Sequence, residues 1–164
     1  MPMLIREATA EDWPAIWPFF QRIVADGETF TYPVDVTETL GRDLWMQNAP
    51  HRTVVAVDDA GAVMGTGKMN ANHMGNGSHI AGASYMVDPA YAGRGVGRAL
   101  CAYSIEWARV AGFRAMQFNA VVETNTHALK LYESLGFEVI GTLPEGFRHP
   151  TEGYVGLRIL HLRL

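Results

Sequence analysis

Residues 85–100 of the chain, YMVDPAYAGRGVGRAL, constrain its fold more than any other stretch. A run of β-forming residues ends at Pro89, and glycines at the alternate positions 93, 95 and 97 then lead into a helical pattern. Glycine at a strand-to-helix turn has three common uses: a cradle of bare backbone N–H groups for a phosphate, close packing of the turn, or an ordinary flexible loop. The glycines alone do not separate these uses.

The spacing of these glycines excludes the two common nucleotide-binding motifs. A dinucleotide fingerprint, G-x-G-x-x-G, counted from Gly93 ends on Arg98, and counted from Gly95 it ends on Leu100. The Gly-Lys pair at 67–68 does not form a P-loop, because methionine follows the lysine. A helix N-terminus remains, whose free N–H groups and macrodipole suit a pyrophosphate.

The composition is that of one ordinary globular domain spanning residues 1–164. Of these residues 48% are hydrophobic and 18% are charged, and no low-complexity run occurs. The N-terminus lacks a leader-like pattern and no apolar run of about 18 residues exists, so we expect a cytoplasmic protein without a membrane partner. The net charge of −4 and the scattered basic residues argue against nucleic acid as a partner.

Neither the histidines nor the cysteine indicates a reactive centre. The six histidines have no metal-like spacing, so we expect no metal. The one cysteine, Cys101, cannot form an intramolecular disulfide. Its apolar surroundings are more typical of a buried core thiol than of a nucleophile.

Apolar periodicity and turn residues predict the element order β-α-α-β-β-β-α-β-α-β-β. The helix over 9–27 is expected to start at Thr9, to accept Pro14 in its first turn, and to kink or break near Pro18. The strand-helix-strand unit over 85–121 requires a parallel, right-handed crossover, which gives a mixed α/β sheet with helices on both faces. The expected strands are 3–8, the two arms of a hairpin over 51–72, 78–89, 113–122, 137–143 and 154–164, and the other helices are 35–48, 96–112 and 124–136.

Two stretches together resemble the Gcn5-related N-acetyltransferase (GNAT) family. Its signature is V-x-P-x-x-[RQ]-G-x-G-x-[GA], followed by N-x-x-A-x-x-x-Y-x-x-x-G-F. The second half matches at every position, and the first half departs from the family only at Ala92, which stands where Arg or Gln is usual. The resemblance spans nearly the whole chain and implies the GNAT fold, a mixed, mostly antiparallel sheet of about seven strands that is splayed in the middle. The matching residues are Val87, Pro89, Gly93, Gly95, Gly97, Asn125, Ala128, Tyr132, Gly136 and Phe137.

The resemblance implies acetyl-CoA as the co-substrate. In this family the two central strands separate after a β-bulge, and the pantetheine arm lies in the gap against exposed backbone groups, one of which can polarise the acetyl carbonyl. The N–H groups from Arg94 to Ala99 would hold the pyrophosphate. Arg94 and Arg98 can also reach it, although an arginine in a first helical turn is more often solvated. The implied residues are Met86, Val87, Asp88, Gly93, Arg94, Gly95, Val96, Gly97, Arg98, Ala99, Asn125 and Tyr132.

The resemblance also assigns catalytic roles. Asn125 and Tyr132 are seven residues apart and so face the same side of a helix, where Asn125 would contact the pantetheine arm and Tyr132 would protonate the departing thiolate. Without the motif, a tyrosine in this apolar helix would be read as core. The base that takes the proton of the amine is less defined: Glu28 and Glu123 are the candidates, and each is more often a solvated carboxylate.

The acceptor predicted first is a small amine or amino acid, acetylated by direct attack in a ternary complex. The string FNAVVETN resembles a subgroup containing azetidine-2-carboxylate acetyltransferases, in which the residue equivalent to Asn119 holds a substrate carboxylate. A strand-end hydrogen bond explains Asn119 equally well. A closed pocket around Phe30 and Tyr32 would favour a small substrate, whereas an open groove would favour a peptide or protein amine. A non-catalytic CoA sensor is the third alternative, and a homodimer is compatible with the resemblance.

Overall fold

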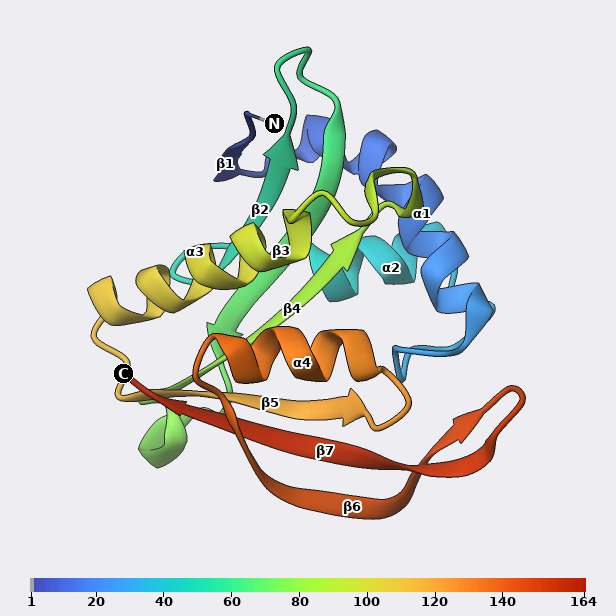
Figure 1. Ribbon diagram of the computed structural model, residues 1–164. Helices are drawn as coiled ribbons and strands as arrows, with labels where there is room; N and C mark the ends of the chain where they lie inside the picture. The colour runs from blue at the N-terminus through green and yellow to red at the C-terminus, as the bar shows by residue number, and fades with distance from the viewer. Residues whose placement is uncertain (1) are drawn as a thin grey trace.

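The computed structural model describes residues 2–164. Seven strands form one mixed sheet in the order β1-β2-β3-β4-β5-β7-β6 (Figure 1). The β4–β5 pair is parallel and the other pairs are antiparallel. The predicted element order and mixed α/β class are confirmed. The strands are β1 (Leu4–Glu7), β2 (Arg52–Val57), β3 (Val63–Ala71), β4 (Ile80–Val87), β5 (Ala115–Val122), β6 (Glu138–His149) and β7 (Gly153–Arg163), and the helices are α1 (Trp13–Asp26), α2 (Glu38–Trp45), α3 (Val96–Val110) and α4 (Thr126–Ser134).

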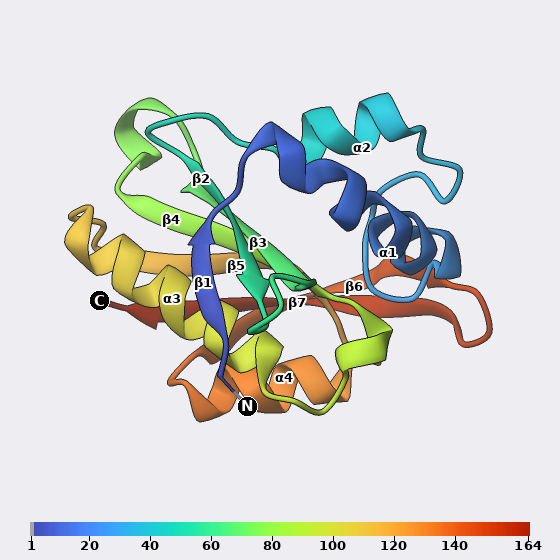
Figure 2. The ribbon, with the colours of Figure 1, turned by 90° about the horizontal axis from the view of Figure 1, so that it is seen from above.

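The helices lie in two layers, one on each face of the sheet. Helices α1 and α2 cover one face, and α3 and α4 cover the other (Figures 1 and 2). Alternating residues of β2 divide between these layers, as the period of a strand requires: Val55 packs in the α1 cluster, and Val54 and Ala56 pack in the α3 cluster. The sheet therefore separates the α1/α2 layer from the α3/α4 layer. A cavity can connect the two layers only where neighbouring strands separate.

Helix α1 begins at Trp13, after a short 3₁₀ turn over Ala10–Asp12. Pro14 lies in its first turn, as predicted, but no break occurs at Pro18. Of the predicted kink or break near Pro18, the break is therefore excluded. The buried face of the helix explains why it continues, because its aromatic and aliphatic side chains pack as one cluster on the sheet and offset the lost backbone hydrogen bond. These side chains are Trp13, Ile16, Phe19, Phe20 and Val24.

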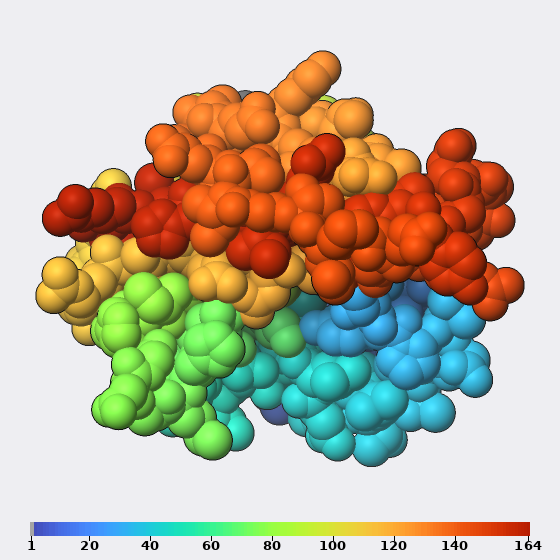
Figure 3. All heavy atoms as spheres, turned by 90° about the horizontal axis from the view of Figure 1, so that it is seen from below, coloured from blue at the N-terminus to red at the C-terminus, as the bar shows by residue number. Residues whose placement is uncertain are grey.

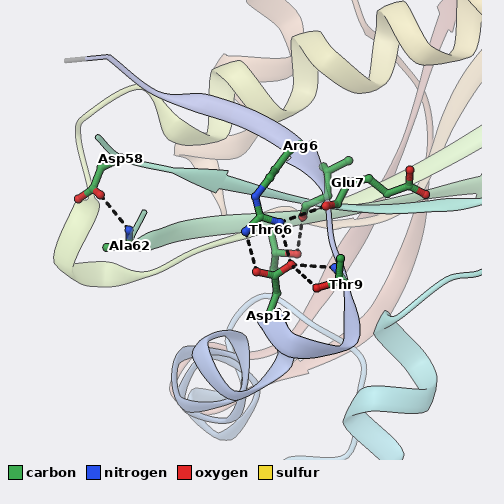
Figure 4. Close-up of polar contacts among 8 residues, drawn as sticks. Arg6, Glu7, Thr9, Asp12, Asp58, Ala62 and Thr66 are labelled. Atoms are coloured by element: carbon green, nitrogen blue, oxygen red, sulfur yellow. Dashed lines mark hydrogen bonds and ion pairs between the residues drawn. The ribbon is translucent and has the colours of Figure 1, made fainter. Parts of the chain in front are cut away.

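An ion pair joins β1 to the start of this helix. The Arg6 guanidinium donates to both carboxylate oxygens of Asp12, at 2.9 and 2.8 Å (Figure 4). Asp12 also accepts a hydrogen bond from the backbone N–H of Thr9 at 2.8 Å. The same view includes the β2–β3 turn, where Asp58 accepts from the N–H of Ala62 and so closes the predicted hairpin.

Strand β6 is longer than the predicted segment 137–143, since it continues through Pro144 to His149. The proline lies where the register with β7 shifts, between Leu143 and Phe147, so its missing N–H interrupts no regular ladder. Proline is tolerated at this position because it lies at an irregularity of an edge strand.

Helix α3 packs one face into the core. Cys101 is fully buried, which confirms the core thiol, and Ile105 and Ala108 are buried beside it. Within residues 2–164, no helix is both long enough and apolar enough to cross a membrane.

Candidate active site

The two parallel strands at the centre of the sheet touch only at one end. β4 and β5 pair at Ile80 with Ala115 and at Ala81 with Met116, and then separate. A cavity of about 820 Å³ lies between them and reaches both helical layers. The β3–β4 register is continuous, so the bulge expected in the strand before the glycine turn is absent. The irregularity lies instead in β5, where the register with β7 shifts between Phe118 and Val121.

Backbone alternation decides which groups of β4 face this gap. The N–H of Asp88 donates to the carbonyl of Met64 on β3 at 2.9 Å, and the carbonyl of Asp88 accepts from Tyr91 at 2.8 Å. Because backbone direction alternates along a strand, Met86 also bonds toward β3, whereas Val87 is directed at the gap. Of the three expected backbone partners of the pantetheine arm, this geometry favours Val87. Met86 lines the cavity, but its backbone groups and those of Asp88 are not directed into the gap.

The glycine turn leads into the N-terminus of α3. Gly93 and Gly95 have φ angles of +76° and +78°, which L side chains rarely adopt. A Cβ atom at either position would meet nothing within 4 Å, so their conformation rather than crowding requires glycine. The first helical bond runs from the N–H of Ala99 to the carbonyl of Gly95 at 3.0 Å. The N–H groups of residues 96–98 precede this bond and have no acceptor within the helix. The N–H of Ala99 is already bonded to Gly95, so it is not available to a phosphate as the resemblance implied.

The two arginines of this turn lie differently. Arg98 lines the cavity and donates to the hydroxyl of Ser134 on α4 at 2.8 Å. Arg94 is not part of the lining, and its guanidinium lies 5.3 Å from the centroid of the Tyr91 ring. Arg98 is therefore the arginine positioned to meet a ligand in the cavity.

Helix α4 supplies Asn125 and Tyr132, and both line the cavity. The side-chain oxygen of Asn125 accepts from the N–H of Ala128 at 3.3 Å and so caps the helix. Burial raises the pKa of Tyr132 well above its usual value and keeps the phenol protonated. Among residues 2–164 its hydroxyl has no hydrogen-bond partner from the protein, so the proton can be donated to a ligand.

Tyr85 also lines the cavity and was not among the predicted site residues. Its hydroxyl shares a hydrogen bond with the hydroxyl of Ser104 on α3. Burial raises the pKa of Tyr85, so it too remains neutral. The apolar run around it on β4 favoured a core role, and the separation of β4 from β5 is what opens the cavity beside it.

On the α1/α2 face, the cavity is lined by polar side chains, and we call this surface the acceptor ledge. Thr66 points to this face, because it accepts a hydrogen bond from the Trp45 indole at 3.0 Å. Successive side chains of a strand point to opposite faces, so alternate residues of β3 point to the same face as Thr66. The β3–β4 register places Ser84 opposite Lys68 on this face. The ledge consists of Lys68, Asn70, Asn72, Ser84, Gln117 and Asn119, all of which line the cavity.

Asn119 lies in the middle of a chain of amide hydrogen bonds on this ledge. Gln117 donates to the side-chain oxygen of Asn119 at 3.0 Å, and Asn119 donates to the side-chain oxygen of Asn72 at 2.7 Å. The sequence singled out Asn119 alone. The alternation in KMNAN, residues 68–72, was the available signal for the other half of the ledge.

The connection between α1 and α2 forms one wall of the ledge. Phe30 and Tyr32 line the cavity and stack with their ring centroids 5.6 Å apart. Burial raises the pKa of Tyr32 to about 12. Figure 3, seen from below the view of Figure 1, shows a recess between the blue α1–α2 connection and the green β3–β4 connection.

The two candidate bases do not line the cavity. Glu123 forms an ion pair with Arg158, whose Nη2 atom is 3.6 Å from Oε2. Glu28 is exposed and precedes Thr29, which does line the cavity. No group of three or more metal-ligating His, Cys, Asp or Glu side chains is present within residues 2–164.

A mixed sheet opened between two parallel strands, with a helix N-terminus at one mouth of the gap and a neutral tyrosine inside it, is the architecture of acetyl-group transferases. The Acetyltransferase (GNAT) family model matches residues 9–137, and the chain belongs to this family. The family, together with the relatives described next, makes the protein an N-acetyltransferase.

Three relatives illustrate the similarity. The chain is 55% identical to a GCN5-related N-acetyltransferase from Kribbella flavida, with a TM-score of 0.96 over 99% of this chain and 98% of that one. It is 25% identical to yncA from Salmonella typhimurium, solved with its cofactor acetyl-CoA, with a TM-score of 0.80 over 100% of this chain and 95% of that one. The N-acetyltransferase aca1 of Schizosaccharomyces pombe is 28% identical over 142 residues, which cover 76% of this chain and 68% of aca1.

Proposed function

We propose that the protein transfers the acetyl group of acetyl-CoA to the primary or secondary amine of a small molecule or amino acid. The observation that carries this proposal is the continuity of the cavity, which joins the N-terminus of α3 to the acceptor ledge through the gap between β4 and β5. Two substrates entering from opposite faces can meet there, which favours direct attack in a ternary complex over a covalent intermediate on the enzyme. Cys101, the only thiol of the chain, is buried and does not line the cavity.

The α3 side of the cavity fits acetyl-CoA. Backbone N–H groups of residues 96–98 are unpaired within the helix and are proposed to bind the pyrophosphate, with Arg98 beside them. Val87 is proposed to pair with the pantetheine arm along the gap, and Asn125 to contact the arm from α4. Acetyl-CoA supplies the activated thioester.

Tyr132 is proposed as the general acid. Its buried, neutral phenol lies in the cavity and lacks a hydrogen-bond partner among residues 2–164, so it can donate a proton to the departing thiolate. The amine must lose a proton as it attacks. Glu28 and Glu123 are proposed as alternative acceptors of that proton through water, because neither side chain lines the cavity.

The acceptor side favours a small substrate. Phe30 and Tyr32 form an aromatic wall, and Asn119 is proposed to bind a polar group of the acceptor. The two connections that flank the recess in Figure 3 restrict access to the ledge from that side. A peptide or protein amine would need an extended groove across this mouth.

Release of CoA from acetyl-CoA, measured against a panel of amines, amino acids and short peptides, tests the proposal. Turnover with small amines or amino acids is the expected result. Turnover with peptides alone would replace the small-molecule assignment, and binding of acetyl-CoA without turnover on any acceptor would support a sensor.

A homodimer is also proposed. The edge strand β6 carries Val139, Ile140 and Leu143, which are 39%, 58% and 55% exposed. Exposed apolar side chains on one edge strand are suited to pairing with a second chain. Light scattering at several protein concentrations gives the mass of the particle, and a monomeric mass throughout would reject the dimer.

A further inference from the structure

Lys68 lies in the acceptor half of the cavity without a carboxylate partner. Its ammonium nitrogen donates to the backbone carbonyl of Leu44 at 3.0 Å, and it lies 5.6 and 5.5 Å from the ring centroids of Tyr32 and Trp45. No ion pair joins it to an acidic side chain within residues 2–164. An ammonium group has three donors, so one backbone carbonyl does not satisfy it.

The charged side chains that line the cavity are all basic. The lining contains Lys68 and Arg98, and no aspartate or glutamate. Arg98 belongs to α3, on the side assigned to acetyl-CoA, which leaves Lys68 as the cation of the acceptor side. A polycationic acceptor, such as a polyamine, would find no counter-charge here and would face repulsion from the lysine.

The surroundings of Lys68 suit a bound anion. Burial lowers the pKa of Lys68, which reflects an unfavourable loss of hydration that an anion would offset. Ser84 lies directly opposite Lys68 on β4 and can add a hydroxyl donor. Farther along the ledge, the buried side-chain nitrogen of Asn72 has no hydrogen-bond partner among residues 2–164. Such a donor is costly to bury unless a ligand accepts from it.

We propose that Lys68 binds a carboxylate of the acceptor, so that the substrate is an amino acid or another small amino-carboxylic acid and not a simple cationic amine. This inference rests on the proposed acetylation of small amines and deepens it by naming the group that is recognised. Lys68 acts in specificity: it holds the carboxylate on the ledge and directs the amine toward the gap.

Matched acceptors and matched variants test this role. The acceptors are the amino acids of the panel, each paired with its primary amide and its decarboxylated amine, which keep the amine and lose the negative charge. The variants are Lys68→Met, Lys68→Arg and Lys130→Met. Lys130 is the other lysine of the chain and lies exposed on α4, outside the cavity. Thermal melts and the affinity for CoA confirm that each variant is folded and keeps the α3 side intact.

For the wild type we expect kcat/KM to be on the order of 10- to 100-fold higher for the acid than for its amide. Lys68→Met should lose that preference through a raised KM for the acid alone, Lys68→Arg should retain part of it, and Lys130→Met should match the wild type. A wild type that acetylates amides or decarboxylated amines as well as acids, or a Lys68→Met variant that loses activity on both alike, would overturn the inference while leaving the acetyltransferase proposal standing.

Calorimetry of the CoA-saturated protein gives a readout independent of turnover. If no acceptor of any kind is acetylated, the proposed function fails, and the same calorimetry still decides the role of Lys68. Tighter binding of an amino acid than of its amide, abolished in Lys68→Met, would support the carboxylate site. Equal binding of the two by the wild type would refute it.

Discussion

The ring of Tyr132 packs against the ring of Phe118, with centroids 4.7 Å apart and planes inclined at 60°. Phe137 and Tyr85 hold the same ring from other sides, at centroid distances of 6.1 and 6.2 Å. The position of the phenol is therefore fixed by its ring, and its hydroxyl is left for the ligand. Packing and proton donation by Tyr132 can be separated by removing the oxygen alone.

Tyr132→Phe should lower kcat by about 10²- to 10⁴-fold and leave the affinity for CoA nearly unchanged, because the variant keeps the packed ring and loses the proton donor. Steady-state kinetics and calorimetry measure the two effects. Tyr154→Phe is the matched control, since Tyr154 is 66% exposed and lies outside the cavity. A Tyr132→Phe enzyme with wild-type kcat, under conditions where product release is shown to be fast, would remove the general-acid role.

The family motif predicts much of the candidate site because the motif is local in sequence. The turn over 93–97 and the helix start at Asn125 form from short-range hydrogen bonds and glycine conformations, which the sequence encodes directly. The assignments at Asp88 and Ala99 were wrong for a different reason. Their N–H groups are taken by Met64 and Gly95, and the first of these partners depends on the register between strands.

Gly97→Glu should abolish binding of CoA. Gly97 lines the cavity, and its Cβ would contact Val87 and Leu131 at 3.6 and 3.7 Å, so a longer side chain must extend into the space of the ligand and bring a like charge to the phosphates. Calorimetry with CoA measures the loss. Ala102→Glu adds the same charge on the exposed side of the same helix and should bind normally. Retained binding in Gly97→Glu would mean that the pyrophosphate lies elsewhere.

Glu28→Gln and Glu123→Gln distinguish the two candidate bases. The variant that removes the base should lower kcat/KM for the amine by about 10²-fold or more and change its dependence on pH, whereas the other should stay within a few-fold of the wild type. Glu123→Gln should also weaken the contact with Arg158, so a stability measurement has to accompany it. If neither variant alters the pH profile, the proton leaves to water without either carboxylate.

The acceptor ledge could not be read from the sequence in the same way. It combines side chains of β3, β4 and β5, which meet only through strand register and through the separation of two strands beyond Ala81. Polar residues at alternate positions, such as Lys68, Asn70 and Asn72, are also what a half-solvated strand would present. Only the tertiary structure places them in the lining of a cavity.

The Arg6–Asp12 pair makes stability depend on pH in acid. Arg6 holds the pKa of the Asp12 carboxyl below its usual value, chiefly through its hydrogen bonds to that carboxyl. A carboxyl whose pKa is lower in the folded than in the unfolded protein stabilises the fold above the unfolded pKa, and the contribution is lost as pH falls through the folded pKa. The pair should therefore contribute fully at neutral pH and fade below about pH 4.

Asp12→Asn should lower the free energy of unfolding by about 1 to 2 kcal/mol at pH 7, because Arg6 is partly exposed and solvent weakens the pair. The deficit should shrink toward zero as pH falls below the folded pKa of Asp12, since the wild-type carboxyl is then neutral as well. Urea unfolding of both proteins from pH 7 down to about pH 2 measures the convergence. Asp59→Asn, in the exposed β2–β3 turn, should have little effect at any pH. A deficit for Asp12→Asn that stays constant across this range would assign the role of Asp12 to packing or capping instead of charge.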